Sequence, residues 1–145
     1  MSTNVYRPAK DDYYLNIAKA VSERSTCYYW KTGAIIVKEN GVIAGSGYSG
    51  SSKEAPNCKE TGACPFERDC GHKPDGTQGE CLGVHAEINA MVRSRFEDMD
   101  GATMYLYSED RDTGEYVKLE PDSLTSKIMH NCGIKRIVTG RVRVE

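Results

Sequence analysis

At 145 residues, with 39% hydrophobic and 28% charged side chains, the chain has the composition of one globular domain with a single core. Its net charge of −2, from 19 basic and 21 acidic residues, argues against a dedicated duplex nucleic-acid binder, which usually carries a basic excess. No apolar run reaches membrane-spanning length, and residues 1–10 lack the apolar core of a signal peptide. A cytoplasmic protein without membrane contacts is therefore expected, with one domain over residues 1–145.

The first third of the chain predicts a helix and a β-hairpin. Asp11 is a suitable N-cap for a helix over residues 11–25, which repeats apolar side chains at helical spacing. Residues 33–38 contain a short apolar run typical of a buried strand. Asn40 and Gly41 form a strong hairpin turn signal, so residues 42–48 are expected to return as an antiparallel strand.

Residues 50–82 form a cysteine-rich insert. This segment is rich in Gly, Pro, Cys and charge, and it shows neither the period of a strand nor that of a helix. So long a segment without regular structure is unusual inside a compact domain unless something ties it down. Cytosolic thiols stay reduced, so the clustered cysteines favour a structural zinc over disulfides. The alternative is a flexible loop with reduced surface thiols.

The second half of the chain alternates helices and strands. A helix is expected from about residue 83 to 96, a strand over 102–107, a polar loop over 108–120, a helix from Pro121 closed by Gly133, and a strand over 135–139. Two strand–helix–strand units imply right-handed parallel crossovers. The predicted fold is therefore α/β, a three-layer α-β-α sandwich around a mixed sheet.

His85 and Glu87 stand at the start of the helix expected over 83–96. They precede Ile88 and Met91 by three and four residues, so both should project from the first turn towards the buried side, on a helical face that continues through Val92, Arg95 and Phe96. Burying an imidazole and a carboxylate is costly unless something uses them. A metal held by the imidazole, with the carboxylate moving protons of a metal-bound water, is one such use. A hydrogen-bonded core histidine and a glutamate that complements the helix dipole are the alternative.

Five stretches carry a resemblance to a known family. They are STC with KTGAIIV over residues 25–37, GYSG over 47–50, VHAEINA over 84–90, GATMY over 101–105 and CGIKRIV over 132–138. With them the chain resembles the cytidine deaminase superfamily, specifically its deoxycytidylate (dCMP) deaminase branch. The resemblance implies the cytidine deaminase-like fold, which agrees with the sandwich predicted above.

The resemblance also implies a catalytic centre. In the family one zinc is held by the histidine of the H-A-E motif and by two cysteines of a P-C-x-x-C turn, while the glutamate moves protons during attack on C4 of cytosine. His85 would be the ligand and Glu87 the proton shuttle. Here the turn reads PDSLT over residues 121–125, so Asp122 and Thr125 replace the two cysteines. A carboxylate can bind zinc but a threonine hydroxyl is a poor ligand. Cys132 and His130 lie too far along the helix to substitute, so the catalytic zinc is expected to be weak or absent.

A second, structural zinc is common in the dCMP deaminase branch. The resemblance places its ligands at Cys27, Cys58, Cys64 and Cys81, with Cys70 and His72 as alternatives. It also implies a nucleotide-like ligand contacted by Tyr48, Ser108 and Thr125, and a homo-oligomer. Tyr107 and Glu109 would share the loop that faces the base, and Lys31 and Arg111 would be possible phosphate contacts.

Three hypotheses follow. The chain catalyses hydrolytic deamination of a cytosine-type nucleotide, or closely related chemistry, with His85, Glu87 and Asp122. Alternatively, it has left zinc chemistry and binds a nucleotide-like ligand, runs metal-free chemistry on its carboxylates or regulates a partner. The third possibility, a small zinc-ribbon-like interaction module, is disfavoured by the regular α/β pattern.

Overall fold

The computed structural model describes residues 7–27, 30–51 and 83–142. Within them the chain forms, in order, α1 (Lys10–Ser22), β1 (Trp30–Val37), β2 (Ile43–Tyr48), β3 (Gly50–Ser51), β4 (Gly83–Val84), α3 (Ala86–Val92), α4 (Phe96–Met99), β5 (Thr103–Asp110), α5 (Ser123–Asn131) and β6 (Arg136–Thr139). None of the helices in these ranges is long and apolar enough to cross a membrane.

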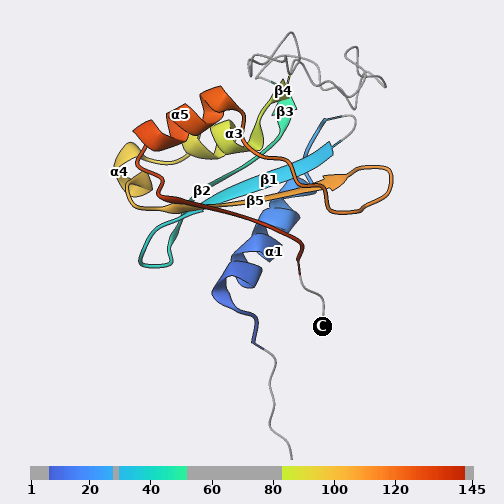
Figure 1. Ribbon diagram of the computed structural model, residues 1–145, viewed down its shortest axis with the longest axis horizontal. Helices are drawn as coiled ribbons and strands as arrows, with labels where there is room; N and C mark the ends of the chain where they lie inside the picture. The colour runs from blue at the N-terminus through green and yellow to red at the C-terminus, as the bar shows by residue number, and fades with distance from the viewer. Residues whose placement is uncertain (1–6, 28–29, 52–82, 143–145) are drawn as a thin grey trace, which may run out of the picture.

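The main sheet is mixed, as predicted. Its strand order is β2-β1-β5-β6, with β1 antiparallel to both neighbours and β5 parallel to β6. Since β2 and β5 both run opposite to β1, they run in the same direction. The segment with α3 and α4 therefore joins two parallel strands across β1, and α5 joins β5 to β6 (Figure 1). β3 and β4 form a separate antiparallel pair.

Helices cover both faces of the sheet, which confirms the three-layer sandwich. Figure 1 shows α1 on one side and α3, α4 and α5 on the other. Alternate residues of the central strands supply one core for each side. Ile35 and Tyr105 pack with Leu15 of α1, and Ile36 and Met104 belong to the core beneath α3 and α5.

The first helix is shorter than expected. It begins at Lys10 and ends at Ser22, and Ala9 rather than Asp11 occupies the N-cap position. Asp11 lies inside the first turn, where its carboxylate accepts hydrogen bonds from Tyr105 and Arg136 and so ties α1 to β5 and β6. The helix packs tightly on β1, since a Cβ on Gly33 would lie 2.3 Å from the Ala18 carbonyl oxygen.

The prediction of a single helix over residues 83–96 is wrong. β4 takes the first two residues, α3 ends at Val92, and α4 restarts at Phe96. The Ser94 hydroxyl donates to the Ala90 carbonyl oxygen, a bond that competes with helix continuation. Val92 is consequently 77% exposed and Phe96 66% exposed, so the buried apolar face ends at Met91.

The strand expected over residues 102–107 spans Thr103–Asp110, so the polar loop begins after Asp110 and not at residue 108 as predicted. β1 begins at Trp30, earlier than the predicted residue 33, and Trp30 pairs with Asp110. The two turn predictions are confirmed by left-handed glycines. Gly41, with φ of 88°, turns the β1–β2 hairpin, and Gly133, with φ of 85°, closes α5.

Candidate functional site

His85 and Asp122 meet across the N-termini of two helices. His85 is the N-cap residue of α3 and Asp122 is the N-cap residue of α5. Their side chains are 18% and 10% exposed, and His85 Nδ1 lies 3.9 Å from Asp122 Oδ2. The fold thus brings together two residues that are 37 positions apart in the sequence. Together with Glu87 and Thr125 we call them the His85 cluster.

Asp122 has a structural role within this cluster. Its Oδ1 accepts a hydrogen bond of 2.7 Å from the backbone N–H of Thr125. This is the N-cap interaction, which satisfies one of the backbone donors left open at a helix start. One carboxylate oxygen of Asp122 is therefore committed to the helix, and the other faces His85.

Glu87 and Thr125 are the buried members of the cluster. Glu87 lies in the first turn of α3, two residues after His85, and is only 4% exposed. Thr125 lies in the first turn of α5 and is 1% exposed. Its Oγ1 is buried and has no hydrogen-bond partner among the residues the structure describes. A buried hydroxyl without a partner costs on the order of 1–3 kcal/mol of stability.

The imidazole of His85 is held in its neutral form. Burial lowers the pKa of His85 below its ordinary value, and the nearby Asp122 carboxylate opposes this effect only in part. At neutral pH the ring therefore carries one N–H donor and one nitrogen lone pair, which can accept a hydrogen bond or bind a metal.

Acidification is expected to destabilise the protein through this histidine. The unfolded chain has the higher histidine pKa, so between the folded pKa and about 6.5 it binds more protons than the native state. The free energy of unfolding should fall as the pH drops below about 6.5. Urea unfolding of the wild type and of His85→Asn at pH 8 and pH 5.5 measures this, and the pH dependence of the variant should be shallower. Equal slopes would contradict the assignment of the effect to His85.

The residues present do not fit the catalytic zinc of the family. Such a zinc needs three protein ligands and an open position. The cluster offers one imidazole, one carboxylate already bonded to the helix, and a neutral hydroxyl. Two ligands of a tetrahedral zinc with bonds of about 2.0–2.1 Å lie roughly 3.3 Å apart, whereas His85 Nδ1 and Asp122 Oδ2 are 3.9 Å apart. Within the described ranges no group of three or more His, Cys, Asp or Glu side chains could hold a metal ion.

Two of the predicted ligand contacts lie on different strands of the main sheet. Ser108 lies two residues after Leu106 on β5 and so shares the face covered by α3 and α5, where its Oγ donates to Thr32 Oγ1. Tyr48 ends the edge strand β2, and its ring centroid lies 6.0 Å from the guanidinium group of Arg24, after α1, and 5.7 Å from that of Arg93, after α3. The fold therefore places Ser108 on the face of His85 and the Tyr48 ring at the edge of the sheet.

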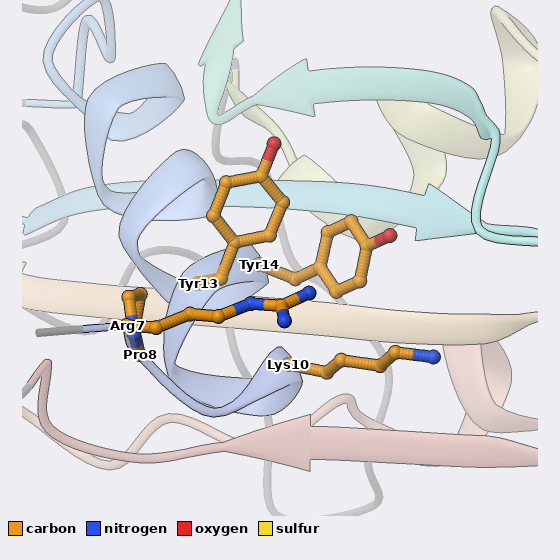
Figure 2. A pocket seen from close by; sticks show the side chains of 5 residues that line it. All are labelled: Arg7, Pro8, Lys10, Tyr13 and Tyr14. Atoms are coloured by element: carbon orange, nitrogen blue, oxygen red, sulfur yellow. The ribbon is translucent and has the colours of Figure 1, made fainter. Parts of the chain in front are cut away.

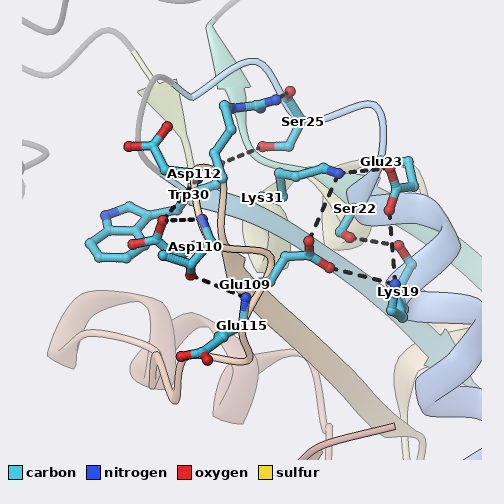
Figure 3. A network of polar contacts seen from close by, with 12 residues as sticks. Lys19, Ser22, Glu23, Ser25, Trp30, Lys31, Glu109, Asp110, Asp112 and Glu115 are labelled. Carbon is cyan, nitrogen blue, oxygen red and sulfur yellow. Dashed lines mark hydrogen bonds and ion pairs between the residues drawn. The ribbon is translucent and has the colours of Figure 1, made fainter. Parts of the chain in front are cut away.

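The other residues considered as base or phosphate contacts are engaged elsewhere. Figure 3 shows Lys31 in a network on the α1 side, 2.7 Å from Glu23 and 3.9 Å from the buried Glu109. Burial and the Glu109 carboxylate raise the pKa of Tyr107, on the same side, to about 12. Arg111 donates hydrogen bonds to the backbone carbonyl oxygens of Ser25 and Cys27.

Cys27 is the one predicted structural-zinc ligand that lies among the described residues. It is half-buried just beyond α1, and its backbone carbonyl oxygen accepts a hydrogen bond from Arg111. The other predicted ligands and alternatives lie outside the described residues, namely Cys58, Cys64, Cys70, His72 and Cys81. The structural zinc therefore stays a prediction.

A surface pocket of about 360 Å³ lies at the N-terminus of α1. Figure 2 shows its lining by the side chains of Arg7, Pro8, Lys10, Tyr13 and Tyr14. None of these belongs to the His85 cluster, which lies on the other face of the sheet.

Comparison with known proteins agrees with this architecture. The family model described as the cytidine and deoxycytidylate deaminase zinc-binding region matches residues 8–141. The deoxycytidylate deaminase of Mycobacterium phage D29 is 37% identical over 137 residues, which cover 91% of this chain and 94% of the relative. The deoxycytidylate deaminase of Schizosaccharomyces pombe is 34% identical over 111 residues, and this chain spans about a third of that protein, 33%.

A solved structure gives the same result for the fold. The dCMP deaminase from the cyanophage S-TIM5 superposes with a TM-score of 0.63 at 25% identity, over 92% of this chain and 84% of the other. That enzyme has also been crystallised in complex with dCMP and dUMP. The sheet order, the paired helix N-termini and the matched residues lead to one conclusion: this chain belongs to the cytidine and deoxycytidylate deaminase family.

Proposed function

We propose that the chain binds a cytosine-type nucleotide such as dCMP and acts on it by hydrolytic deamination or closely related chemistry. The observation that carries this proposal is the placement of Glu87, a buried carboxylate, two residues after His85 in the first turn of α3. The most similar relatives named above are deoxycytidylate deaminases, and the S-TIM5 enzyme binds dCMP and dUMP.

In this reaction water replaces the amino group at C4 of cytosine and ammonia leaves. Glu87 is the proton-transfer group: its carboxylate passes one proton of the attacking water to ring nitrogen N3, and then passes the remaining hydroxyl proton to the departing amine, so that the C4 carbonyl forms as ammonia leaves. His85 is neutral and can hold the ring or the water by a hydrogen bond. Because the cluster does not fit a zinc ion, no step in this scheme passes through a metal, and slow turnover is expected.

Glu87→Gln should lower the rate of dCMP deamination by about 10²–10⁴-fold, because the amide keeps the shape of the side chain but cannot carry the proton. Conversion of dCMP to dUMP is followed by chromatography, and dCMP affinity by isothermal titration calorimetry. Glu97→Gln is the matched control, since Glu97 is exposed on α4 and pairs with Arg95. A Glu87→Gln protein with wild-type turnover would rule out the proton-transfer role.

A second candidate is nucleotide binding without turnover, as a sensor or as a regulator of a partner. The observation that favours it is the pair Asp122 and Thr125, which replaces two thiolates with a helix cap and a hydroxyl. The same measurements separate the candidates, because a sensor would bind dCMP in the calorimeter and produce no dUMP.

Two further features belong to the proposal. A structural zinc bound by Cys27, Cys58, Cys64 and Cys81 would tie the insert over residues 50–82 to the end of α1, with Cys70 and His72 as alternative ligands. A homo-oligomer is also proposed, and light scattering coupled to size-exclusion chromatography measures its mass.

A further inference from the structure

Thr125 carries a hydroxyl that the described part of the fold leaves unused. Its side chain is 1% exposed, and Oγ1 has no hydrogen-bond partner among the described residues. Buried hydroxyl groups are normally bonded, because leaving one unpaired forfeits its solvation without compensation.

Two other hydroxyl groups at helix ends of this protein donate hydrogen bonds to backbone carbonyl oxygens. Ser22 in α1 donates to the Lys19 carbonyl oxygen at 2.5 Å, and Ser94 after α3 donates to the Ala90 carbonyl oxygen at 2.8 Å. Threonine in a helix commonly makes the same bond to a carbonyl three or four residues earlier. Thr125 could reach such a carbonyl in the first turn of α5, yet its hydroxyl makes no bond of this kind.

The surroundings indicate which ligand would use this hydroxyl. Thr125 shares its turn with Asp122, whose Oδ1 is bonded to the Thr125 N–H and whose Oδ2 faces His85. The cluster is rich in acceptors, since Asp122 and Glu87 are carboxylates and His85 is neutral. A ligand that supplies N–H donors together with an acceptor would complement this set, and an amino-substituted pyrimidine has both.

We propose that Thr125 is a ligand-recognition residue, whose buried hydroxyl is kept unpaired in the free protein so that it can hydrogen-bond an aminopyrimidine at the His85 cluster. This inference rests on the proposed function and adds a specificity residue at a position where the family has a metal ligand. It has two consequences of opposite sign. The hydroxyl weakens the free protein and strengthens the complex.

The test is Thr125→Val, which exchanges the hydroxyl for a methyl group of similar size. Without ligand, the melting temperature should rise by about 2–4 °C, since a buried unpaired group is removed. The affinity for dCMP in isothermal titration calorimetry should fall about tenfold, the size of one lost hydrogen bond. Thr125→Ser keeps the hydroxyl and should stay within about threefold of the wild-type affinity. Ser123→Ala, on the exposed first residue of α5, should change neither quantity.

The outcomes separate this inference from the proposed function. Wild-type protein that binds no dCMP would overturn the proposed function and this inference with it. Wild-type and Thr125→Val proteins that bind dCMP equally would overturn the inference alone. A Thr125→Val protein that is less stable than wild type would show that the hydroxyl has a partner in the free protein, and would also overturn it. Failure of Thr125→Val to fold, while Thr125→Ser folds, would overturn the inference in the same way, because the hydroxyl would then have a stabilising partner in the free protein.

Discussion

Replacing Asp122 and Thr125 together by cysteine is expected to add one zinc ion per chain and to raise the rate of dCMP deamination at least about 100-fold. The backbone at these two positions already forms the first turn of α5, and Asp122 Oδ2 lies 3.9 Å from His85 Nδ1. Two thiolates and one imidazole form a tight tetrahedral donor set with an open position. A bound zinc supplies several kcal/mol to a hydrolysis by activating water, which corresponds to the stated rate.

The measurement is metal content per chain by elemental analysis, beside the chromatographic deamination assay. Cobalt substitution adds an independent readout, because cobalt–thiolate coordination gives a characteristic visible absorption. Cysteines at Ser123 and Ser126, on the same turn, are the matched control and should leave the metal content unchanged. Adding His85→Ala to the double variant should remove the extra zinc. If His85→Ala already lowers the zinc content of the wild-type protein by one per chain, the conclusion that the native cluster does not fit zinc is wrong.

Much of the fold follows from local sequence signals. The continuous apolar run over residues 34–37 and the turn at Asn40 and Gly41 predict the β1–β2 hairpin, because turn chemistry and short apolar runs are local properties. The closure of α5 by Gly133 is local in the same way. Two crossovers between parallel strands then leave few possible topologies.

The sequence predictions fail where tertiary contacts determine the ends of helices and strands. Val92 and Phe96 continue the apolar spacing of α3, yet the chain leaves the helix between them, and Ser94 bonds back to Ala90. The extension of β5 to Asp110 depends on pairing with Trp30 and on burial of Ser108, neither of which is a local feature. Asp11 could cap α1, but its partners Tyr105 and Arg136 lie more than 90 residues away in the chain.

The candidate site is likewise predictable from the sequence only in part. Motif spacing identifies His85, Glu87, Asp122 and Thr125, and the fold places His85 beside Asp122. The place of each strand residue in the sheet is not evident from the motif. Ser108 bonds Thr32 on the face covered by α3 and α5, whereas the Tyr48 ring lies at the sheet edge beside Arg24 and Arg93. Arg111 shows a similar limit. An exposed-looking arginine in a polar loop holds two backbone carbonyl groups beside Cys27, and no sequence signal marks that role.

Removal of one structural-zinc ligand is expected to cost the protein its zinc and much of its stability. Cys27 is the ligand that joins the described domain to the cysteine-rich insert in this proposal. For Cys27→Ser we expect the loss of one zinc per chain and a fall in melting temperature of about 10 °C, equivalent to roughly 3 kcal/mol or more, since metal binding free energy adds directly to folding. Elemental analysis and thermal unfolding measure the two effects on one sample.

Cys132→Ser provides the matched control. Cys132 is also half-buried, but it lies at the end of α5 against the core beneath α3 and α5. Its replacement should cost about 1 kcal/mol through lost packing and leave the zinc content unchanged. If the two variants hold equal amounts of zinc, Cys27 is not a ligand, and the insert over residues 50–82 must be tied down by another set of its own cysteines or by none. If Cys27→Ser alone loses zinc, the metal ties the insert to the end of α1 and does not serve the His85 cluster, which would then depend on Glu87 and the hydrogen-bonding groups of Asp122 and Thr125.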